Sequence, residues 1–257
     1  MGDCSTGIEI EIKVECGEIT TKNFELTEMQ MEMGNKVSEV ESQYHKNPIS
    51  PSVKTYLSGS GTYTTPSGVR WLRVRMVAGG GGGGGISNGV GYINGADGGD
   101  SQFGTIYADH GSGSSVTGGG AESIGEGGSG GSGTATLRIS GESVINLTKS
   151  LEDPSGGQGG STILGLGGAG GYGLGGNGSS APANSGGGGG GAGGNSSWSS
   201  YSLSGGGGGE YVEIYISDPA PSYPYVVGAG GAGGDGASAD GGNGGSGVII
   251  IEEHYGY

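Results

Sequence analysis

Residues 156–209 read GGQGGSTILGLGGAGGYGLGGNGSSAPANSGGGGGGAGGNSSWSSYSLSGGGGG, and this stretch decides the fold. Glycine weakens a helix interior by roughly 1 kcal/mol relative to alanine and leaves a strand without side chains to pack. From Gly167 the triplets GGA, GGY, GLG and GNG follow one another, with Gly167, Gly170, Gly173 and Gly176 in phase. Three residues per turn is the period of the polyproline II helix, whose backbone groups point sideways. The stretch therefore predicts polyglycine II helices packed side by side through N–H···O and Cα–H···O contacts.

A flexible glycine-rich linker is the alternative that composition alone favours. Strand patterns between the glycine runs argue against it. Residues 69–77 and 210–217 alternate apolar and polar side chains, residues 134–147 hold two strand candidates, and residues 248–251 form an apolar run typical of a strand buried on both faces. Glycine runs that begin and end on strands can be held in place, and the strands offset the entropy that glycine loses on ordering. We therefore expect a mainly β fold that contains ordered glycine rods.

Composition excludes several classes of protein. The chain has 257 residues, of which 70 are glycine and 8 are proline, and its net charge is −15. The few prolines and the lack of a continuous Gly-X-Y repeat exclude collagen. Without a cluster of lysine and arginine to neutralise phosphates, we expect no nucleic-acid partner. No long apolar segment predicts a secretory leader or a membrane span.

Residues 1–46 are expected to form a small α+β module. Residues 8–16 alternate strictly and predict a strand, and residues 18–24 are a candidate for the returning strand of a hairpin. Thr27 and Gln30 fit a capping box, after which apolar residues recur at helical spacing. The stripe consists of Leu26, Met29, Met33, Val37, Val40 and Tyr44. It can cover the hairpin, or it can serve attachment and oligomerisation, because a module of this size has a small core.

Residues 47–61, with Pro48, Pro51 and several serines, read as a linker, and residues 62–257 as a glycine-rich display domain. Arg73 and Arg75 share one face of the strand predicted at residues 69–77. Such a row can bind an anion or can be salt-bridged to neighbouring strands.

Glycine abundance produces false catalytic motifs. A strand that enters a glycine run at Gly79 resembles a dinucleotide-binding turn, but the helix that this fingerprint needs cannot form there. His45, His110 and His254 lack metal or triad spacing, and Cys4 and Cys16 lack a metal-binding pattern. The pair formed by Asp109 and His110 is either an acid–base pair or a solvated turn. We expect no enzymatic activity, no cofactor and no metal.

Aromatic residues among small polar ones form the inserts between glycine runs. Such rings can stack on a sugar or fill a pocket on a protein receptor while their neighbours form hydrogen bonds. They can equally fold back as lids over the glycine layer. The candidate receptor-binding residues are Trp198, Tyr201, Tyr172, Phe103, Tyr107 and His110.

Four stretches carry a resemblance to a known family. They are VRWLRVRMV (residues 69–77) running into polyglycine, GGGGGEYVEIYIS (205–217), YPYVVGAGG (223–231) and GGSGVIIIEEHY (244–255). Together they resemble the glycine-rich distal domain of bacteriophage tail fibres, over about residues 62–257. Residues 1–61 do not resemble the attachment domain of those adhesins.

The resemblance implies a virion protein, made in the host cytoplasm, that attaches a phage to the host surface. Its partners would be a host glycan or outer-membrane protein and other tail or fibre proteins. The chain would form a homotrimer or dock on a trimeric fibre. A purely structural spike or connector without a receptor site is the alternative function, and a disordered glycine-rich matrix is a third.

Overall fold

The computed structural model describes residues 50–87, 91–117, 122–146, 155–194 and 203–255. The chain divides into two compact units, residues 1–48 with residue 257 and residues 49–256, and the described residues belong to the second. The expected N-terminal module and its apolar stripe lie outside the described residues. All regular elements in the described ranges are strands, which confirms a mainly β fold. Among these residues, no helix has the length and apolar character needed to cross a membrane.

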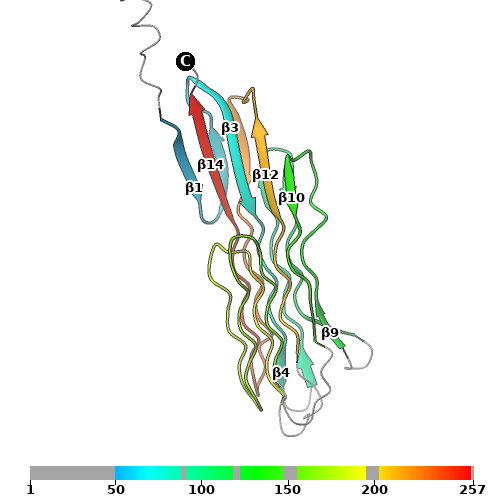
Figure 1. The fold of residues 1–257 in the computed structure, drawn as a ribbon. Helices are drawn as coiled ribbons and strands as arrows, with labels where there is room; N and C mark the ends of the chain where they lie inside the picture. Colours follow the sequence, from blue (N-terminus) through cyan, green and yellow to red (C-terminus); the bar gives the residue numbers. More distant parts are fainter. Residues whose placement is uncertain (1–49, 88–90, 118–121, 147–154, 195–202, 256–257) are drawn as a thin grey trace, which may run out of the picture. The chain divides into compact units, whose positions relative to one another are not determined.

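One antiparallel sheet has five strands in the order β1-β14-β3-β12-β10 (Figure 1). The strands are β1 (Ser52–Tyr56), β3 (Val69–Val77), β10 (Leu137–Ile139), β12 (Tyr211–Ile216) and β14 (Val248–Tyr255). β3 lies in the centre, where Met76 pairs with Val212 on one side and with Ile249 on the other. The strands predicted at residues 69–77, 210–217 and 248–251 are confirmed.

A second sheet packs on one face of the first, in the order β2-β13-β6-β7. Its strands are β2 (Ser60–Thr64), β6 (Ser101–Phe103), β7 (Ile106–Ala108) and β13 (Ser222–Val226). The apolar core between the sheets combines Leu72 and Met76 of β3 with Tyr63 and Phe103 of the second sheet. In the apolar run at residues 248–251, Val248, Ile249 and Ile251 are buried as expected, and Ile250 is partly buried on the face away from this core.

The predicted linker is also wrong in part, because β1 and the start of β2 lie within residues 47–61. Each is an edge strand, paired on one side only, with β14 and β13 respectively. An edge strand buries little, and in β1 only Ser52 and Tyr56 are even partly buried. Its apolar pattern is therefore weak, and the pairing that orders it comes from distant parts of the chain.

Two small sheets lie at the far ends of the glycine segments (Figure 1). β4 (Gly85–Ser87) pairs with β5 (Gly91–Ile93), and β9 (Glu122–Gly125) lies between β8 (Ser115–Thr117) and β11 (Val144–Asn146). The two strands predicted within residues 134–147 are thus confirmed as β10 and β11, which belong to different sheets.

Twelve extended glycine-rich segments connect the two ends of the described unit, and we call them the glycine segments. They are residues 78–84, 94–100, 109–114, 126–133, 140–143, 155–161, 166–172, 176–181, 186–194, 203–210, 227–235 and 239–247.

In segment 78–84, successive N–H groups donate to three neighbouring segments in turn, at 2.8–3.2 Å. The bonds are Gly79 N to Gly99 O, Gly80 N to Gly245 O, Gly81 N to Gly207 O, Gly82 N to Ala96 O, Gly83 N to Gly242 O and Gly84 N to Ser204 O. The residue number of the acceptor falls as that of the donor rises, so these three neighbouring segments run antiparallel to segment 78–84. The period of three predicted from the sequence is the period of these hydrogen bonds.

The carbonyl groups of the same segment accept from three further segments, at 2.8–2.9 Å. The bonds are Gly111 N to Gly79 O, Gly231 N to Gly80 O, Gly189 N to Gly81 O, Ser114 N to Gly82 O, Gly234 N to Gly83 O and Ala192 N to Gly84 O. These partners run parallel, so segment 78–84 is enclosed by three antiparallel and three parallel segments.

Segments 186–194 and 203–210 are likewise each hydrogen-bonded to six surrounding segments, four antiparallel and two parallel, which include segment 78–84 and each other. We call these three the inner segments and the remaining nine the outer segments. The inner segments hold the longest glycine runs, residues 79–85, 186–191 and 205–209, and are buried. A Cβ atom on Gly82 would lie 1.9 Å from the Ala232 carbonyl oxygen, so no larger residue fits there.

Outer segments tolerate a larger residue at every third position, because that position faces solvent. In segment 227–235 the exposed residues are Ala229, Ala232 and Asp235. The sequence repeat from Gly167 to Gly176 does not form one rod. Gly173 and Gly175 have φ angles of 66° and 73°, and the chain reverses there between segments 166–172 and 176–181.

Candidate functional site

Chain reversals gather at the end of the glycine segments that lies away from the large sheets (Figure 1). We call this end the tip. It contains the paired strands β4 and β5, the paired strands β8 and β9 and the turn at residues 173–175, and segments 140–143, 186–194 and 227–235 also run toward it. Backbone hydrogen bonds of one scaffold therefore hold the described residues that lie at this end.

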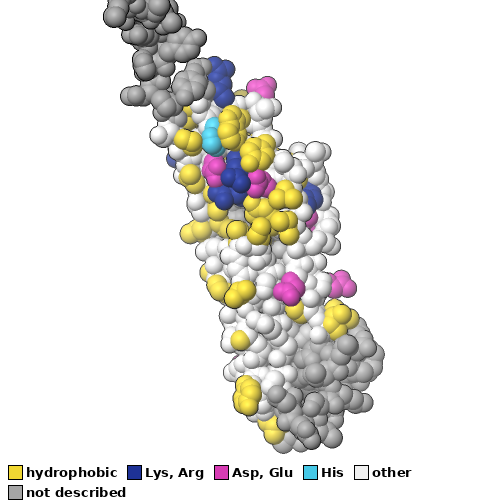
Figure 2. Space-filling view, in the orientation of Figure 1, with side chains coloured by type: hydrophobic (Ala, Val, Ile, Leu, Met, Phe, Trp, Pro, Cys, Tyr) yellow, Lys and Arg dark blue, Asp and Glu magenta, His cyan; other side chains and the backbone are white. Residues whose placement is uncertain are grey.

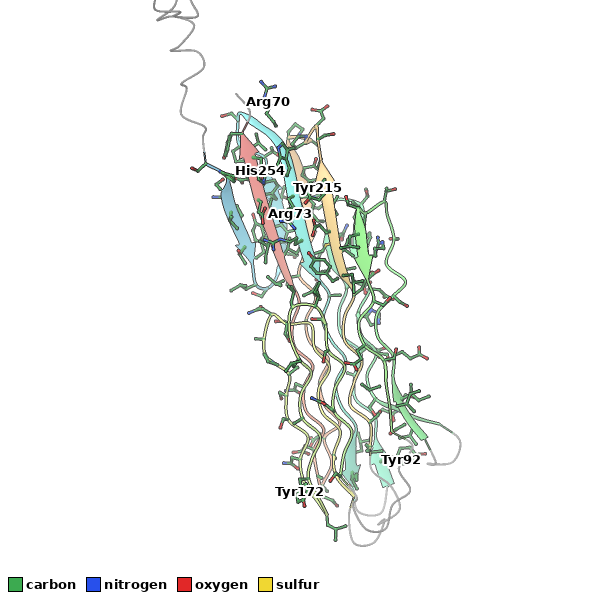
Figure 3. The ribbon with its side chains drawn as sticks, viewed as in Figure 1. Arg70, Arg73, Tyr92, Tyr172, Tyr215 and His254 are labelled. Atoms are coloured by element: carbon green, nitrogen blue, oxygen red, sulfur yellow. The ribbon has the colours of Figure 1, made fainter. Side chains whose placement is uncertain are left out.

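Tyr172 is the described candidate that the tip presents to solvent, with its side chain 87% exposed (Figure 3). It occupies the outward third position of its segment, after Leu166 and Ala169. The preceding residue is held on both sides: Gly171 N donates to Gly191 O, and Gly171 O accepts from Gly156 N. The ring thus extends from a backbone that is held on two sides.

Sequence reasoning missed three exposed apolar residues, namely Leu174 and Tyr92 at the tip and Leu166 at the opposite end of the segment that carries Tyr172. For Leu166 the signal was available, because it is three and six residues from Ala169 and Tyr172 in the repeat. Leu174 lies between the two glycines of the turn, and no pattern in the sequence identifies Tyr92.

The other candidates do not join Tyr172. Trp198 and Tyr201 lie outside the described residues. Phe103 is 1% exposed and stacks on Tyr223 in the core, with ring centroids 4.8 Å apart, so its expected availability to a receptor is wrong. The insert that contains it is the β6–β7 hairpin of the second sheet.

Tyr107 and His110 also lie near the large sheets, at opposite ends of a short stretch that starts in β7. Tyr107 is half-buried, and its carbonyl oxygen accepts a hydrogen bond from Arg138 Nη1 at 2.9 Å. His110 Nδ1 lies 2.6 Å from Asp100 Oδ1 and 3.5 Å from Asp109 Oδ1. Burial lowers the pKa of His110, but the hydrogen bond to Asp100 and the nearby carboxylates outweigh burial and raise the pKa above 6.5.

The outer face of the five-stranded sheet carries aromatic and charged side chains (Figures 2 and 3). Trp71 stacks on His254 with centroids 3.5 Å apart and an interplanar angle of 6°. Arg73 binds both carboxylate oxygens of Glu213, at 3.0 and 3.2 Å. Arg75 pairs with Glu252. The arginine row is therefore salt-bridged, and its charge is already balanced within the sheet.

Glu213 makes the stability of this face depend on pH. The hydrogen bond from Arg73 outweighs burial and holds the pKa of Glu213 below its ordinary value of 4.5. A depressed carboxyl pKa contributes stability that is present above the unfolded pKa and lost as the pH falls through the folded pKa. We expect Glu213→Gln to lower the urea midpoint most at neutral pH, with the gap to the wild type closing in acid.

Arg73→Gln should reproduce this trend, because it removes the group that depresses the pKa. Urea unfolding of both variants, from neutral pH into the acid range, checks the prediction. A gap between wild type and variants that stays constant with pH would contradict it.

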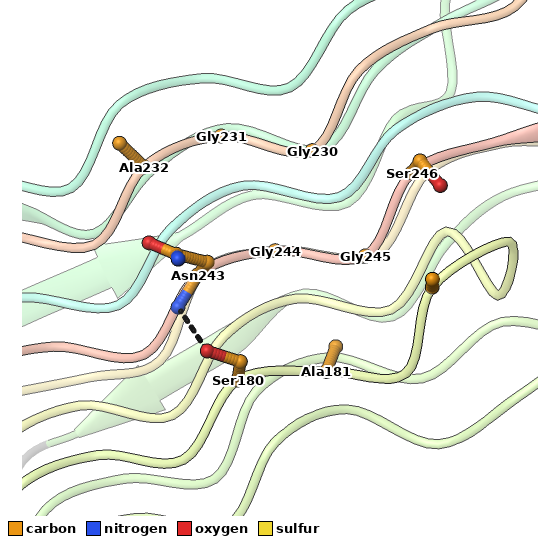
Figure 4. Close-up of a pocket in the computed structure, with 10 residues that line it drawn as sticks. Ser180, Ala181, Gly230, Gly231, Ala232, Asn243, Gly244, Gly245 and Ser246 are labelled. Carbon is orange, nitrogen blue, oxygen red and sulfur yellow. Dashed lines mark hydrogen bonds between the residues drawn. The ribbon is translucent and has the colours of Figure 1, made fainter. Parts of the chain in front are cut away.

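A shallow groove of about 470 Å³ lies over segment 239–247, beside residues 180–183 and 230–232 (Figure 4). Its lining consists only of glycine, alanine, serine and asparagine. Asn243 N donates to Ser180 Oγ at 3.1 Å across it. Without a charged or aromatic side chain, the groove lacks the anchors that dominate specific recognition, and we assign it no ligand.

Comparison with models of known protein families found no match to this chain. Comparison with curated proteins found no similar sequence.

Proposed function

We propose that this chain is a bacteriophage tail-fibre or adhesin tip protein that attaches the virion to the host cell surface. The proposal rests on the resemblance of residues 62–257 to distal tail-fibre domains, and the arrangement of the glycine segments supports it. In this proposal the protein binds the host cell surface and has no catalytic activity. Its partners would be a host glycan or outer-membrane protein and a neighbouring fibre protein.

The glycine segments in this proposal are polyglycine II helices. Two features support this, namely the rotation of hydrogen bonds through three directions and the exposure of every third residue in the outer segments. A three-fold helix without internal hydrogen bonds directs its backbone groups to surrounding chains in this way. Close approach of the chains requires glycine, as the contacts of a Cβ atom at Gly82 illustrate.

One observation carries the proposal: at one end of the bundle, the described residues that flank six connections are held by hydrogen bonds within that bundle. Loops held in preset positions lose less conformational entropy on binding, which favours affinity. Loop sequence can then vary to set specificity while the scaffold stays constant. Residues 1–46 would serve attachment or trimerisation in the virion.

Adsorption to host cells tests this function through Tyr172. Labelled full-length protein is incubated with cells of the host bacterium, and bound label is measured against concentration. We expect Tyr172→Ala to weaken binding by about fivefold or more, the loss of about 1 kcal/mol that marks an interface anchor. Its melting temperature should stay nearly unchanged, because the ring is 87% exposed and packs little.

Tyr215→Ala is the matched control, since Tyr215 is a half-exposed tyrosine on the sheet, away from the tip. It should leave host binding unchanged even if it lowers the melting temperature. Equal loss of binding in both variants would contradict a tip receptor site.

A structural spike or connector is the second candidate. The hydrogen-bonded bundle of glycine segments supports this connector function, because a rod of this kind also serves as a spacer. If wild-type protein does not bind host cells at all, the connector replaces the adhesin as the proposed function.

A further inference from the structure

Three metal-ligating side chains meet where the second sheet passes into the glycine segments. Asp100 directly precedes β6, and Asp109 and His110 directly follow β7. Because β6 and β7 pair from Ser101 with Ala108, the residues that flank this hairpin lie side by side. One ligand atom from each of Asp100, Asp109 and His110 lies within 4.8 Å of the other two. Sequence spacing hid this cluster, since Asp100 is distant along the chain from the other two residues.

Hydrogen bonds orient both carboxylates. Asp109 Oδ2 accepts from Gly130 N at 3.0 Å and from Ser129 N at 3.3 Å, which leaves Oδ1 facing His110. Asp100 Oδ1 accepts from His110 N at 3.1 Å as well as facing Nδ1. Such outer hydrogen bonds orient ligand groups in metal sites.

The charge of the cluster is unbalanced. Among the described residues, no lysine or arginine forms an ion pair with Asp100 or Asp109; His110 is their partner. Asp97 adds a third carboxylate to the field at His110 and accepts from Gly113 N at 2.8 Å. A bound cation would compensate this negative charge better than one imidazole does.

We propose that Asp100, Asp109 and His110 bind a divalent transition-metal ion, preferentially Zn²⁺, through Asp100 Oδ1, Asp109 Oδ1 and His110 Nδ1. Mixed carboxylate and imidazole ligation suits Zn²⁺, whereas Ca²⁺ takes oxygen ligands. The ion binds His110 Nδ1 in place of a proton: an imidazolium releases that proton to solvent, and a neutral imidazole carries its remaining proton on Nε2. Water completes the coordination, because all three side chains are partly exposed.

Binding requires a small adjustment of the cluster. Zinc bonds of about 2.0 Å at tetrahedral angles place two ligand atoms about 3.3 Å apart. Asp100 Oδ1 and His110 Nδ1, now 2.6 Å apart, would separate by about 0.7 Å to reach this spacing, while the 3.5 Å between Asp109 Oδ1 and His110 Nδ1 is already close to it. The bound ion would join segments 94–100 and 109–114 beside the sheet and so stabilise their junction.

Calorimetric titration of the full-length chain with ZnCl₂ tests the site. Because Cys4 and Cys16 are thiols that also bind Zn²⁺, the titrated chain carries Cys4→Ser and Cys16→Ser. We expect a zinc site whose association constant falls at least about tenfold in Asp109→Asn and in His110→Asn, the lower end of effects seen for groups that only orient ligands. Zinc should raise the melting temperature of the parent chain and not that of the variants.

Asp100→Asn provides a third ligand variant, which should fold because the Asp100 side chain is 47% exposed. Asp240→Asn, at an exposed position of an outer segment, is the matched control and should titrate like the parent chain. Identical zinc titrations of the parent and the three ligand variants would overturn the proposal. Calcium binding as tight as zinc binding, lost in the same variants, would overturn the assignment of the metal. This test does not depend on host binding, so it is independent of the proposed function.

Discussion

Gly82→Ala is expected to destabilise the glycine-rich unit severely. The new Cβ atom would lie 1.9 Å from the carbonyl oxygen of Ala232, 2.4 Å from its carbonyl carbon and 2.8 Å from Gly233 N. All three are backbone atoms of a segment that is itself hydrogen-bonded to its neighbours, so no side chain can move aside. We expect a loss of about 3 kcal/mol or more, at or beyond the upper end of the usual cost of overpacking. Urea unfolding, followed by circular dichroism, measures it.

Gly59→Ala is the matched control. Gly59 has a φ of 79°, and nothing lies within 4 Å of a Cβ atom built there. The cost at this position is backbone strain alone, about 1–2 kcal/mol for a residue with a Cβ atom in the left-handed region. If Gly82→Ala costs no more than Gly59→Ala, the close packing of segments 78–84 and 227–235 is refuted.

The second large effect is expected from Arg138→Ala. Glu210 ends an inner segment and is 1% exposed. Its Oε2 accepts from Arg138 Nη1 at 3.0 Å and from Asp109 N at 3.0 Å. Removing the guanidinium leaves a buried carboxylate without its counter-charge, which typically costs about 3–5 kcal/mol. Arg138 also donates to the carbonyls of Ser132 and Gly133, so the segment that leads into β10 loses its anchor as well.

A double-mutant cycle separates the ion pair from the rest of this loss. Glu210→Gln in the Arg138→Ala background removes the stranded charge, so the double variant should be more stable than Arg138→Ala alone. Thermal unfolding of the two single variants and the double variant gives the coupling energy. Additive losses of stability would show that the Glu210 carboxylate does not depend on Arg138 as its counter-charge.

Strand positions could be read from the sequence because alternation of apolar and polar residues reports burial of one face. β3 and β12 carry this pattern in full, with Leu72 and Val74, or Val212 and Ile214, toward the core. Edge strand β1 has no such pattern and was assigned to a linker. For Phe103 the sequence left exposure and internal packing open, because the pattern of a short hairpin among glycines does not indicate which face of the sheet its side chains cover.

The candidate site was only partly predictable, because a local sequence pattern does not report which residues strand pairing brings together. Tyr172 was a candidate from its place among glycines, and its exposure is one of the two alternatives that the sequence left open. The cluster around His110 depends on β6 pairing with β7, a contact that brings Asp100 beside residues later in the chain. Spacing along the chain carries no information on such a contact.

By itself the sequence determined that strands alternate with glycine segments of period three, because local composition governs which backbone conformations and side-chain faces are possible. The tertiary structure alone decided where each segment lies. Residues 79–85 belong to the inner group although they lie outside the stretch 156–209, and the repeat from Gly167 is broken by a reversal at Gly173. The physical reason is that an extended glycine segment has no hydrogen bonds of its own: its partners come from other segments, and only the assembled bundle determines which ones.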